Sequence, residues 1–323
     1  MNINNNTLLF SQAVVLPIDT CWFISGLIDA EGSFGVNVVK HSTNSTGFAV
    51  LISFEVGMNS KDKSLLEMIN NNLELNCKIY NNISDDTVKL KVSNLDTIVN
   101  KVIPFFNKYT LFTQKKGDFI LMTKVVDIIK NKEHLKLEGL ADIIKIKSVM
   151  NLGLSDKLKS EFSYLDMSSS SKGLDIKRSE LYSINYTDIN NSWLAGFIEG
   201  EACFFVSIYD SPKSKLGKAV QLVFKITQHI RDKHLLENIR NLLNCGRVEI
   251  RNTNEACDLT VTSFKEFKEH VIPFLENYRL LGQKLYNYND FKLVYDIMLM
   301  KGHLTEEGLE KIVEIKNRMN TKR

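Results

Sequence analysis

Several features that would assign a protein to a broad class are missing from this sequence of 323 residues. No apolar run approaches the roughly 18 residues needed to cross a bilayer, and the longest, over residues 119–129, is interrupted by lysine and aspartate. The five cysteines form no CxxC pair, which argues against a structural zinc site and favours buried, reduced thiols. We therefore expect a protein that does not enter the membrane.

A targeting segment is missing as well. The first twenty residues have neither the basic start of a secretory signal nor the arginine-rich, amphipathic character of a mitochondrial transit peptide. An organellar protein with this start would have to be made inside the organelle. Abundant Asn, Ile and Lys is compatible with an AT-rich genome, and we expect a mitochondrial origin without import.

A dominant charge of one sign is also absent. Lys and Arg number 41 against 38 Asp and Glu, a formal net charge of +3, and 44% of the residues are hydrophobic. This balance excludes a wholly disordered chain or a polybasic tail protein. It neither demands nor forbids a nucleic-acid partner, which would have to be recognised through local segregation of charge.

What the sequence does contain is an internal repeat. The segment WFISGLIDAEGSF, which begins at Trp22, recurs as WLAGFIEGEACFF, which begins at Trp193. Residues 134–151 match residues 303–320 at 10 of 18 positions, where average composition would give roughly one. Two homologous halves follow, in agreement with the prior of about 150 residues per domain.

The repeat divides the chain into four segments. Residues 152–190 have no counterpart and contain a serine run, which is typical of a linker, although part of it could be helical. We expect an N-terminal extension over residues 1–18, a first repeat over residues 19–151, and a second repeat over residues 191–323.

Each half predicts the same order of elements, αββαββα with further helices. A helix capped by Asp19 or Thr20, and in the second half by Asn191 or Ser192, leads into the glycine-containing motif. Alternating strands, helices near residues 95–107 and 113–130, and a last helix near 135–151 complete the first half. This order implies an α+β fold in which helices cover one face of an antiparallel sheet, so the other face must meet something polar.

The repeated motif predicts that two helices pack closely against each other. Gly26 and Ala30, like Gly196 and Gly200, lie four residues apart and share one helix face. Small residues there let two helix backbones approach, which predicts a pseudo-twofold axis between the halves.

Two glutamates, Glu31 and Glu201, would then meet at the ends of these helices. At ~5 Å and an effective dielectric of ~20 they would repel by ~3 kcal/mol. Divalent cations would remove this penalty, and carboxylate oxygens suit Mg²⁺. The alternative is that each glutamate is a solvated residue at a helix C-terminus, which the matching downstream order of the two copies disfavours.

The two motif segments, residues 24–32 and 194–202, resemble the signature motifs of single-chain LAGLIDADG homing endonucleases, especially those carried by group I introns of fungal mitochondrial genomes. The repeated VIPF, Tyr-x-Leu-x-x-x-Lys and HLxxxGL elements are also similar to that family's. The resemblance implies a monomer that cleaves double-stranded DNA at a long, non-palindromic site by divalent-metal-dependent hydrolysis, leaving 3′ overhangs. It also implies Mg²⁺ or Mn²⁺ as cofactor, with Ca²⁺ able to occupy the site without supporting cleavage.

The resemblance also assigns roles to residues. It implies that Glu31 and Glu201 bind the metal, with the backbone carbonyls of Ala30 and Gly200 as auxiliary ligands. Lys115 and Lys284 match basic residues that stabilise charge or organise water near the scissile phosphates, and Gln228 matches a water-positioning glutamine. Asp29 and Glu199 match structural acids that help hold the motif helices.

Two departures from the family pattern, Met58 in place of that glutamine in the first half and Ala202 in place of a glycine in the second, put equal cleavage rates of the two strands in doubt.

Strand alternation places one set of side chains on the open sheet faces, away from the helices. Mixed donors and acceptors suit the edges of bases in the major groove, and two such faces side by side would form a saddle over about 20 bp. The expected DNA-contacting residues are Ser33, Gly35, Asn37, Val39, Ser53, Glu55, Lys78, Tyr80, Lys89 and Lys91, then Cys203, Phe205, Ser207, Tyr209, Gln221, Lys225, Thr227, Arg247, Glu249, Arg251, Asp258 and Thr260.

Two other functions use the same scaffold. One is an intron-RNA maturase or RNA-binding splicing cofactor, with intron RNA as the partner. The other is a degenerate DNA-binding relative, in which we would expect one of the motif acids to be lost.

Overall fold

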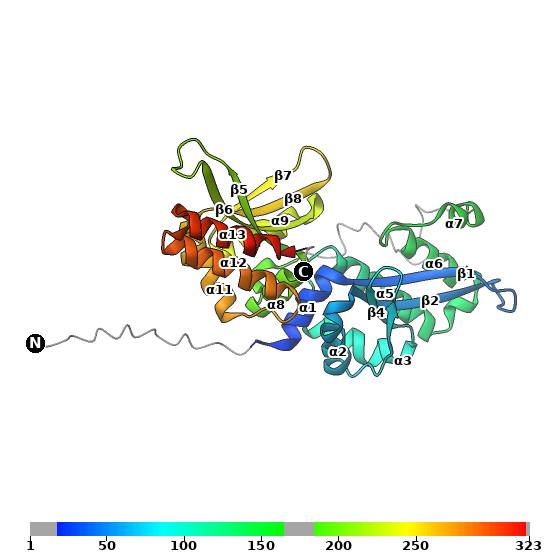
Figure 1. Cartoon of the computed structure of the whole chain (residues 1–323). Helices are drawn as coiled ribbons and strands as arrows, with labels where there is room; N and C mark the ends of the chain where they lie inside the picture. The colour runs from blue at the N-terminus through cyan, green and yellow to red at the C-terminus, as the bar shows by residue number, and fades with distance from the viewer. Residues whose placement is uncertain (1–17, 165–183, 321–323) are drawn as a thin grey trace, which may run out of the picture.

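Two halves with the same order of elements make up the computed structural model, which describes residues 18–164 and 184–320 (Figure 1). The first half contains α1 (Thr20–Glu31), β1 (Gly32–Lys40), β2 (Phe48–Asn59), η1 (Ser60–Asp62), α2 (Lys63–Asn72), β3 (Ile79–Asn82), β4 (Thr87–Val92), α3 (Leu95–Thr97), η2 (Ile98–Val102), α4 (Ile103–Lys108), α5 (Lys115–Lys130), η3 (Glu133–Leu135) and α6 (Leu137–Ser148). The second half contains α8 (Asn191–Glu201), β5 (Ala202–Asp210), β6 (Lys218–His229), η6 (Ile230–Asp232), α9 (Lys233–Leu243), β7 (Arg247–Ile250), β8 (Ala256–Val261), α10 (Phe264–Glu266), η7 (Phe267–Val271), α11 (Ile272–Asn277), α12 (Lys284–Leu299), η8 (Gly302–Leu304) and α13 (Glu306–Asn317).

Each half carries a four-stranded antiparallel sheet, in the order β1-β2-β4-β3 and β5-β6-β8-β7. Phe34, Val36 and Val38 of β1 are buried, whereas Ser33 and Asn37 are exposed, because alternate residues of a strand point to opposite faces. Helices α5 and α12 pack on the buried faces of the two sheets. The α+β class and the αββαββα order predicted from the sequence are confirmed.

The N-terminal caps of the motif helices link the two halves. Asp19 caps α1, as predicted, by accepting the backbone N–H groups of Cys21 and Trp22 at 3.0 and 3.2 Å. The prediction for α8 was wrong by one residue, because Asn190 is its cap and accepts the Ser192 N–H at 2.7 Å. The Ser192 hydroxyl instead accepts the backbone N–H of Asp19 at 3.1 Å, so the starts of the two motif helices are joined directly.

The helix expected over residues 95–107 is interrupted by a π-helical turn. The turn η2 precedes α4, and η7 precedes α11 in the same way. Each is followed by the proline of a VIPF element, which has no N–H to donate to the preceding turn. The duplicated proline therefore explains why both halves show the same irregularity.

The segment between the halves is partly helical, as expected. Helix α7 (Asp156–Glu161) lies against the first sheet, where Glu161 forms an ion pair of 2.5 Å with Lys40, and the 3₁₀ turn η5 (Tyr186–Asp188) precedes α8. Residues 1–17 of the predicted N-terminal extension and the serine run at 168–171 lie outside the described residues. Within the described ranges, no helix combines the length and apolarity needed to cross a membrane.

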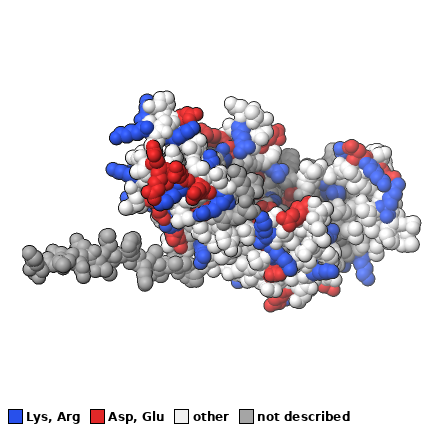
Figure 2. All heavy atoms as spheres, viewed as in Figure 1, with Lys and Arg blue, Asp and Glu red and all other residues white. Residues whose placement is uncertain are grey.

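Acidic side chains gather on the outside of the second half. Figure 2 shows them over the helical layer formed by α12 and α13, where Glu306, Glu307, Glu310 and Glu314 are exposed on α13. These charges lie on helices rather than on a sheet. A net charge of +3 therefore does not preclude a locally basic surface elsewhere.

Candidate active site and DNA interface

The helices α1 and α8 lie side by side at the junction of the two halves (Figure 1). A Cβ atom added to Gly26 would lie 1.9 Å from the Trp193 carbonyl oxygen, and one added to Gly196 would lie 1.9 Å from the Phe23 carbonyl oxygen. The contacts are reciprocal, as a pseudo-twofold axis requires. The predicted close approach of the two motif helices is confirmed.

The C-terminal ends of these helices bring the two motif acids into one site. A Cβ atom on Gly200 would lie 2.2 Å from the Ala30 Cβ and 3.3 Å from Glu31 Oε1, so the Glu31 carboxylate lies against the end of α8. Burial raises the pKa of Glu201, and the negative charge of Glu31 adds to that shift. Glu31 and Glu201 therefore interact, as the sequence predicted.

Both predicted lysines reach the same helix ends. Lys115 Nζ donates to the Ala30 carbonyl at 2.5 Å, and Lys284 Nζ donates to the Gly200 carbonyl at 2.7 Å. Burial lowers the pKa of both lysines, while the surrounding carboxylates oppose this shift. The structure thus assembles two carboxylates and two ammonium groups around one pseudo-twofold axis.

The oxygen atoms of this site suit a hard divalent cation. Carboxylates and backbone carbonyls are the ligands that Mg²⁺ prefers in proteins. Among residues 18–164 and 184–320, no three His, Cys, Asp or Glu side chains form a ready-made metal cage, so further ligands would have to come from water or phosphate oxygens. The carbonyls of Ala30 and Gly200 accept lysine hydrogen bonds, and each retains only a second lone pair for a metal.

Gln228 lies beside this site at the end of β6. Its side chain forms a hydrogen bond with the Glu201 carboxylate, which opposes the effect of burial on the pKa of that group. An open pocket next to it is lined by Glu201, Thr227, Gln228, His229, Asn254, Glu255 and Ala256. In the first half Met58 occupies the corresponding place, so only the second half offers a side-chain amide there.

The structural acids hold the loops that precede the lysines. Asp29 accepts hydrogen bonds from Phe112 N–H at 2.7 Å, from Thr113 N–H and Oγ1 at 3.2 and 2.6 Å, and from Trp193 Nε1 at 2.9 Å. Burial raises the pKa of Asp29 to about 6, against the effect of the bonds from Thr113 and Phe112. The Trp193 bond crosses between the halves, so Asp29 also joins the two motif helices.

In the second half, the longer side chain of Glu199 holds the loop that precedes Lys284. It accepts the N–H groups of Leu281, Gly282 and Lys284 at 2.8, 3.0 and 3.2 Å. A Cβ atom on Gly282 would lie 2.8 Å from Glu199 Oε1. The longer glutamate is therefore accommodated by a glycine, whereas the shorter Asp29 is paired with Thr113.

Substitution of Asp29 by Asn tests this arrangement. The variant has one oxygen acceptor in place of two and turns an NH₂ group toward N–H donors, so we expect the free energy of unfolding to fall by about 2–4 kcal/mol. Urea denaturation followed by tryptophan fluorescence measures the change. The exposed Asp96→Asn on α3 is the control, and an equally small effect of both substitutions would contradict the role of Asp29.

Two further carboxylates at this site, Asp62 and Asp232, were not recognised in the sequence as functional. Asp232 accepts the Gln114 N–H at 3.0 Å, and Asp62 accepts the Gln283 N–H at 2.7 Å. The sequence did contain a pattern that could have marked them, because KDKSLLE and RDKHLLE are repeated at the same separation as the two glycine-containing motifs. The sequence does not show that each aspartate binds a backbone N–H group of the opposite half.

On the open face of the first sheet, one acidic side chain lies between two lysines. Glu55 on β2 forms ion pairs with Lys89 and with Lys91, the latter at 2.9 Å. Burial tends to raise the pKa of Glu55, but the two lysines outweigh it and lower this pKa to about 2. Nearby, Lys78 Nζ lies 5.6 Å from the centre of the Tyr80 ring.

Of the ten predicted first-half contacts, seven are exposed, Gly35 and Glu55 are half-buried, and Ser53 is buried. Ser53 was expected to be exposed, but it is only 5% exposed, because it pairs with Gly35 and bonds to Glu55 beneath the lysines. Leu51, which pairs with Asn37, is 52% exposed on the same face and was missed. Apolar atoms at this position suit the methyl group of thymine.

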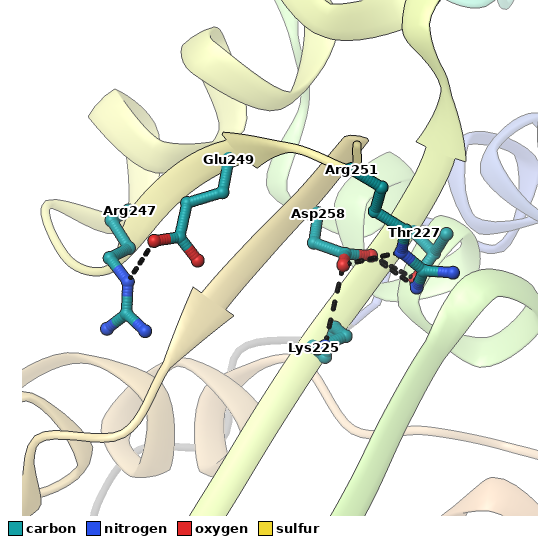
Figure 3. Close-up of polar contacts among 6 residues, drawn as sticks. All are labelled: Lys225, Thr227, Arg247, Glu249, Arg251 and Asp258. Carbon is teal, nitrogen blue, oxygen red and sulfur yellow. Dashed lines mark hydrogen bonds and ion pairs between the residues drawn. The ribbon is translucent and has the colours of Figure 1, made fainter. Parts of the chain in front are cut away.

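In the second sheet one carboxylate, that of Asp258, binds two basic side chains (Figure 3). Asp258 accepts Arg251 Nη2 at 2.7 Å and Nε at 2.8 Å, Thr227 Oγ1 at 2.6 Å and Lys225 Nζ at 3.4 Å. The expected exposure of Asp258 and Thr260 was wrong, since they are only 6% and 7% exposed. Alternation places them on the correct face, but longer neighbouring side chains cover them.

The charges of the two sheets are reversed at matching positions. Glu55 pairs across strands with Lys91, whereas its counterpart Lys225 pairs with Thr260. Lys89 in the first half corresponds to Asp258 in the second. An acceptor on one sheet therefore stands where a donor stands on the other.

Comparisons with known proteins identify the family to which both motif segments belong. A family model described as LAGLIDADG endonuclease matches residues 24–126 and 194–295. A protein named probable intron-encoded endonuclease 2 from Neurospora crassa is 35% identical over 296 residues, or 91% of this chain, and the chain spans only 64% of the length of that relative.

Solved structures are similar over nearly their full length. The crystal structure of the I-LtrWI LAGLIDADG homing endonuclease bound to target DNA has a TM-score of 0.88 and 65% identity, covering 94% of this chain and 98% of that chain. I-SmaMI bound to uncleaved DNA in the presence of calcium ions has a TM-score of 0.86 and 35% identity, covering 93% and 98%. Since the family model includes both motif helices and they pair as α1 and α8, this chain belongs to the LAGLIDADG endonuclease family.

Proposed function

We propose that this protein is a site-specific homing endonuclease that hydrolyses both strands of a long, non-palindromic DNA target as a monomer. The observation that carries the proposal is the meeting of Glu31, Glu201, Lys115 and Lys284 at the ends of the paired helices. A structural framework alone would not require these two like charges to meet at the helix ends, because they repel each other without a cation.

The residues of the site divide the work of phosphodiester hydrolysis. A divalent cation held by the two glutamates would stabilise the charge that develops on the attacking and leaving oxygens. Lys115 and Lys284 place positive charge at the same point without the need to ionise during the reaction. Gln228, which bonds to Glu201, is in position to orient a water molecule, and Met58 stands at the corresponding position of the first half.

We propose Mg²⁺ or Mn²⁺ as the active cofactor, with Ca²⁺ as an ion that supports binding alone. The calcium-containing complex of I-SmaMI with uncleaved DNA supports this division. The carbonyls of Ala30 and Gly200 would join the glutamates as ligands through their second lone pairs.

The open sheet faces would form the DNA-binding saddle, over about 20 bp. The reversal of charge between Glu55 and Lys225, and between Lys89 and Asp258, supports a target whose two halves differ in sequence. Acidic side chains accept from cytosine, and lysine or arginine donates to guanine. A palindrome would present the same base edges to opposite charges.

The cleavage experiment uses the full chain and DNA that spans the insertion junction of the intron in which the reading frame lies. We expect Mg²⁺ to support cuts in both strands with 3′ overhangs, EDTA to abolish them, and Ca²⁺ to support binding without cutting. End labels on each strand locate the cuts. Intact DNA, together with metal-independent binding of the intron RNA, would overturn the proposal and favour the maturase.

The genomic origin is part of the proposal. The name of the Neurospora crassa relative states that it is intron-encoded, and abundant Asn, Ile and Lys is compatible with an AT-rich mitochondrial genome. We propose that the gene lies in a group I intron of a fungal mitochondrial genome and that the protein acts there. Intron RNA as a second partner stays a prediction, which the RNA-binding arm of the experiment above tests.

Arg251 offers a test of base recognition. Asp258 holds two of its nitrogen atoms (Figure 3), so the guanidinium is oriented before DNA arrives. We expect Arg251→Gln to weaken binding of the preferred target by about 1–3 kcal/mol and to relax the choice at one base pair.

Binding in Ca²⁺ to single-base variants of the target measures this effect. The exposed Lys265→Gln on α10 is the control and should change neither affinity nor base preference. Equal weakening of Arg251→Gln on every target sequence would indicate a phosphate contact instead.

A further inference from the structure

The two catalytic lysines lie at helix starts that have no side-chain cap from their own helix. Lys115 is the first residue of α5 and Lys284 the first residue of α12, and the preceding glutamines make no capping bond with their side chains. The first N–H groups of a helix need acceptors from elsewhere. The Lys284 N–H is bound by Glu199 at 3.2 Å. The Lys115 N–H is instead bound by the Thr113 hydroxyl at 3.1 Å, which itself donates to Asp29. Carboxylates bind the N–H groups of the residues just before each lysine.

One carboxylate comes from the same half and one from the other. Asp29 and Glu199 bond the loops of their own halves. The N–H of Gln114 is instead bound by Asp232 of the second half at 3.0 Å, and the N–H of Gln283 by Asp62 of the first half at 2.7 Å. The residue directly before each lysine is therefore held by the opposite half.

The surroundings show that these contacts are built into the interface. Asp232 is only 3% exposed, and a buried carboxylate is retained only where it is paired. A Cβ atom on Gly282 would lie 2.6 Å from Asp62 Oδ1, so a glycine makes room for that carboxylate. Gln283 adds a second contact, since its Nε2 donates to the Lys61 carbonyl at 3.3 Å.

We propose that Asp62 and Asp232 are positioning residues that act across the interface, so that each half sets the orientation of the catalytic lysine in the other half. This inference rests on the proposed endonuclease function. The pseudo-twofold axis relates the two lysines and also the two scissile phosphates, one on each DNA strand. Each carboxylate therefore controls mainly one strand.

The proposal makes a prediction that a purely structural role does not. A catalytic group displaced by about 1 Å can lose about 100-fold in rate. We expect Asp232→Ala to slow cleavage of one strand by about 10- to 100-fold, with the same strand bias as Lys115→Met. Asp62→Ala should slow the other strand and match Lys284→Met. DNA affinity in Ca²⁺ should stay within about threefold of the wild type in each case.

The assay is single-turnover cleavage of a target with a different label on each strand, in Mg²⁺. Two further variants refine the test. One shows whether the hydrogen bond or the charge of Asp232 matters, and the other shows whether Asp232 acts through Lys115. Asp232→Asn retains an oxygen acceptor for the Gln114 N–H, so we expect both strand rates to stay near those of the wild type. The double variant Asp232→Ala/Lys115→Met should be no slower than Lys115→Met on the affected strand, because both changes remove the same contribution.

The control is another buried carboxylate of the second half. Asp290 is 4% exposed and binds Arg318 at 2.8 Å away from the site, so Asp290→Ala should lower stability without strand bias. If Asp232→Ala does not fold, the less buried Asp62 carries the test. Equal slowing of both strands by Asp62→Ala, or no slowing, would overturn the inference. An inactive wild-type protein would instead contradict the proposed function.

Discussion

Replacement of Glu31 or Glu201 by Gln is expected to abolish cleavage of both DNA strands while leaving DNA binding intact. Each glutamine keeps the size of the side chain but removes the charge that a divalent cation requires. Because the two acids share one site, neither variant should retain a normal rate on either strand. We expect a loss of about 1,000-fold or more, measured by single-turnover cleavage in Mg²⁺.

A binding assay in Ca²⁺ accompanies this experiment, since the substituted residues lie at the helix ends and not on the sheet faces. Glu310→Gln, on the exposed side of α13, is the matched control and should cleave normally. Full activity of either motif variant would show that the metal site has been placed wrongly. Loss of binding together with cleavage would show that the glutamates serve the fold or the interface instead.

Substitution of Gly26 or Gly196 by Ala is expected to cause the largest loss of stability. The added methyl group would lie 1.9 Å from a backbone carbonyl oxygen of the opposite helix, and no side-chain rotation can relieve a contact with backbone. The helices must separate, so we expect the free energy of unfolding to fall by about 3 kcal/mol or more. Urea denaturation measures the change.

The same separation should also reduce cleavage, because Glu31 and Glu201 lie at the ends of these helices. Gly57→Ala is the control for stability, since an added Cβ there would meet no atom within 4 Å. If Gly26→Ala were as stable as Gly57→Ala, the close packing of α1 and α8 would be refuted.

Much of the fold could be predicted because the same local patterns occur twice. Alternation placed Phe34 in the core and Asn37 on the open face, and the structure agrees. The small residues of the motif predicted the helix pair, and the position of Glu31 and Glu201 after them predicted a shared acidic site. Each of these inferences depends on periodicity within one element, which sequence spacing determines.

Predictions that depended on neighbouring elements were less accurate. Alternation states the face on which Asp258 lies, but only the packed structure shows that Arg251 and Lys225 cover it. Ser53 is buried for a similar reason. Asn190 rather than Ser192 caps α8, and the Ser192 hydroxyl instead accepts the N–H of Asp19, which is 173 residues away in the chain.

The sequence by itself determined that two homologous halves share one pair of acids and one pair of lysines, because repetition and spacing are properties of the chain. Only the tertiary structure decided how the halves depend on each other. Asp62 and Asp232 bind backbone N–H groups of the opposite half, and a backbone N–H carries no mark of its partner in the sequence. The physical reason is that such a hydrogen bond depends on where the carboxylate of one half lies relative to the backbone of the other half, which only the packed structure determines.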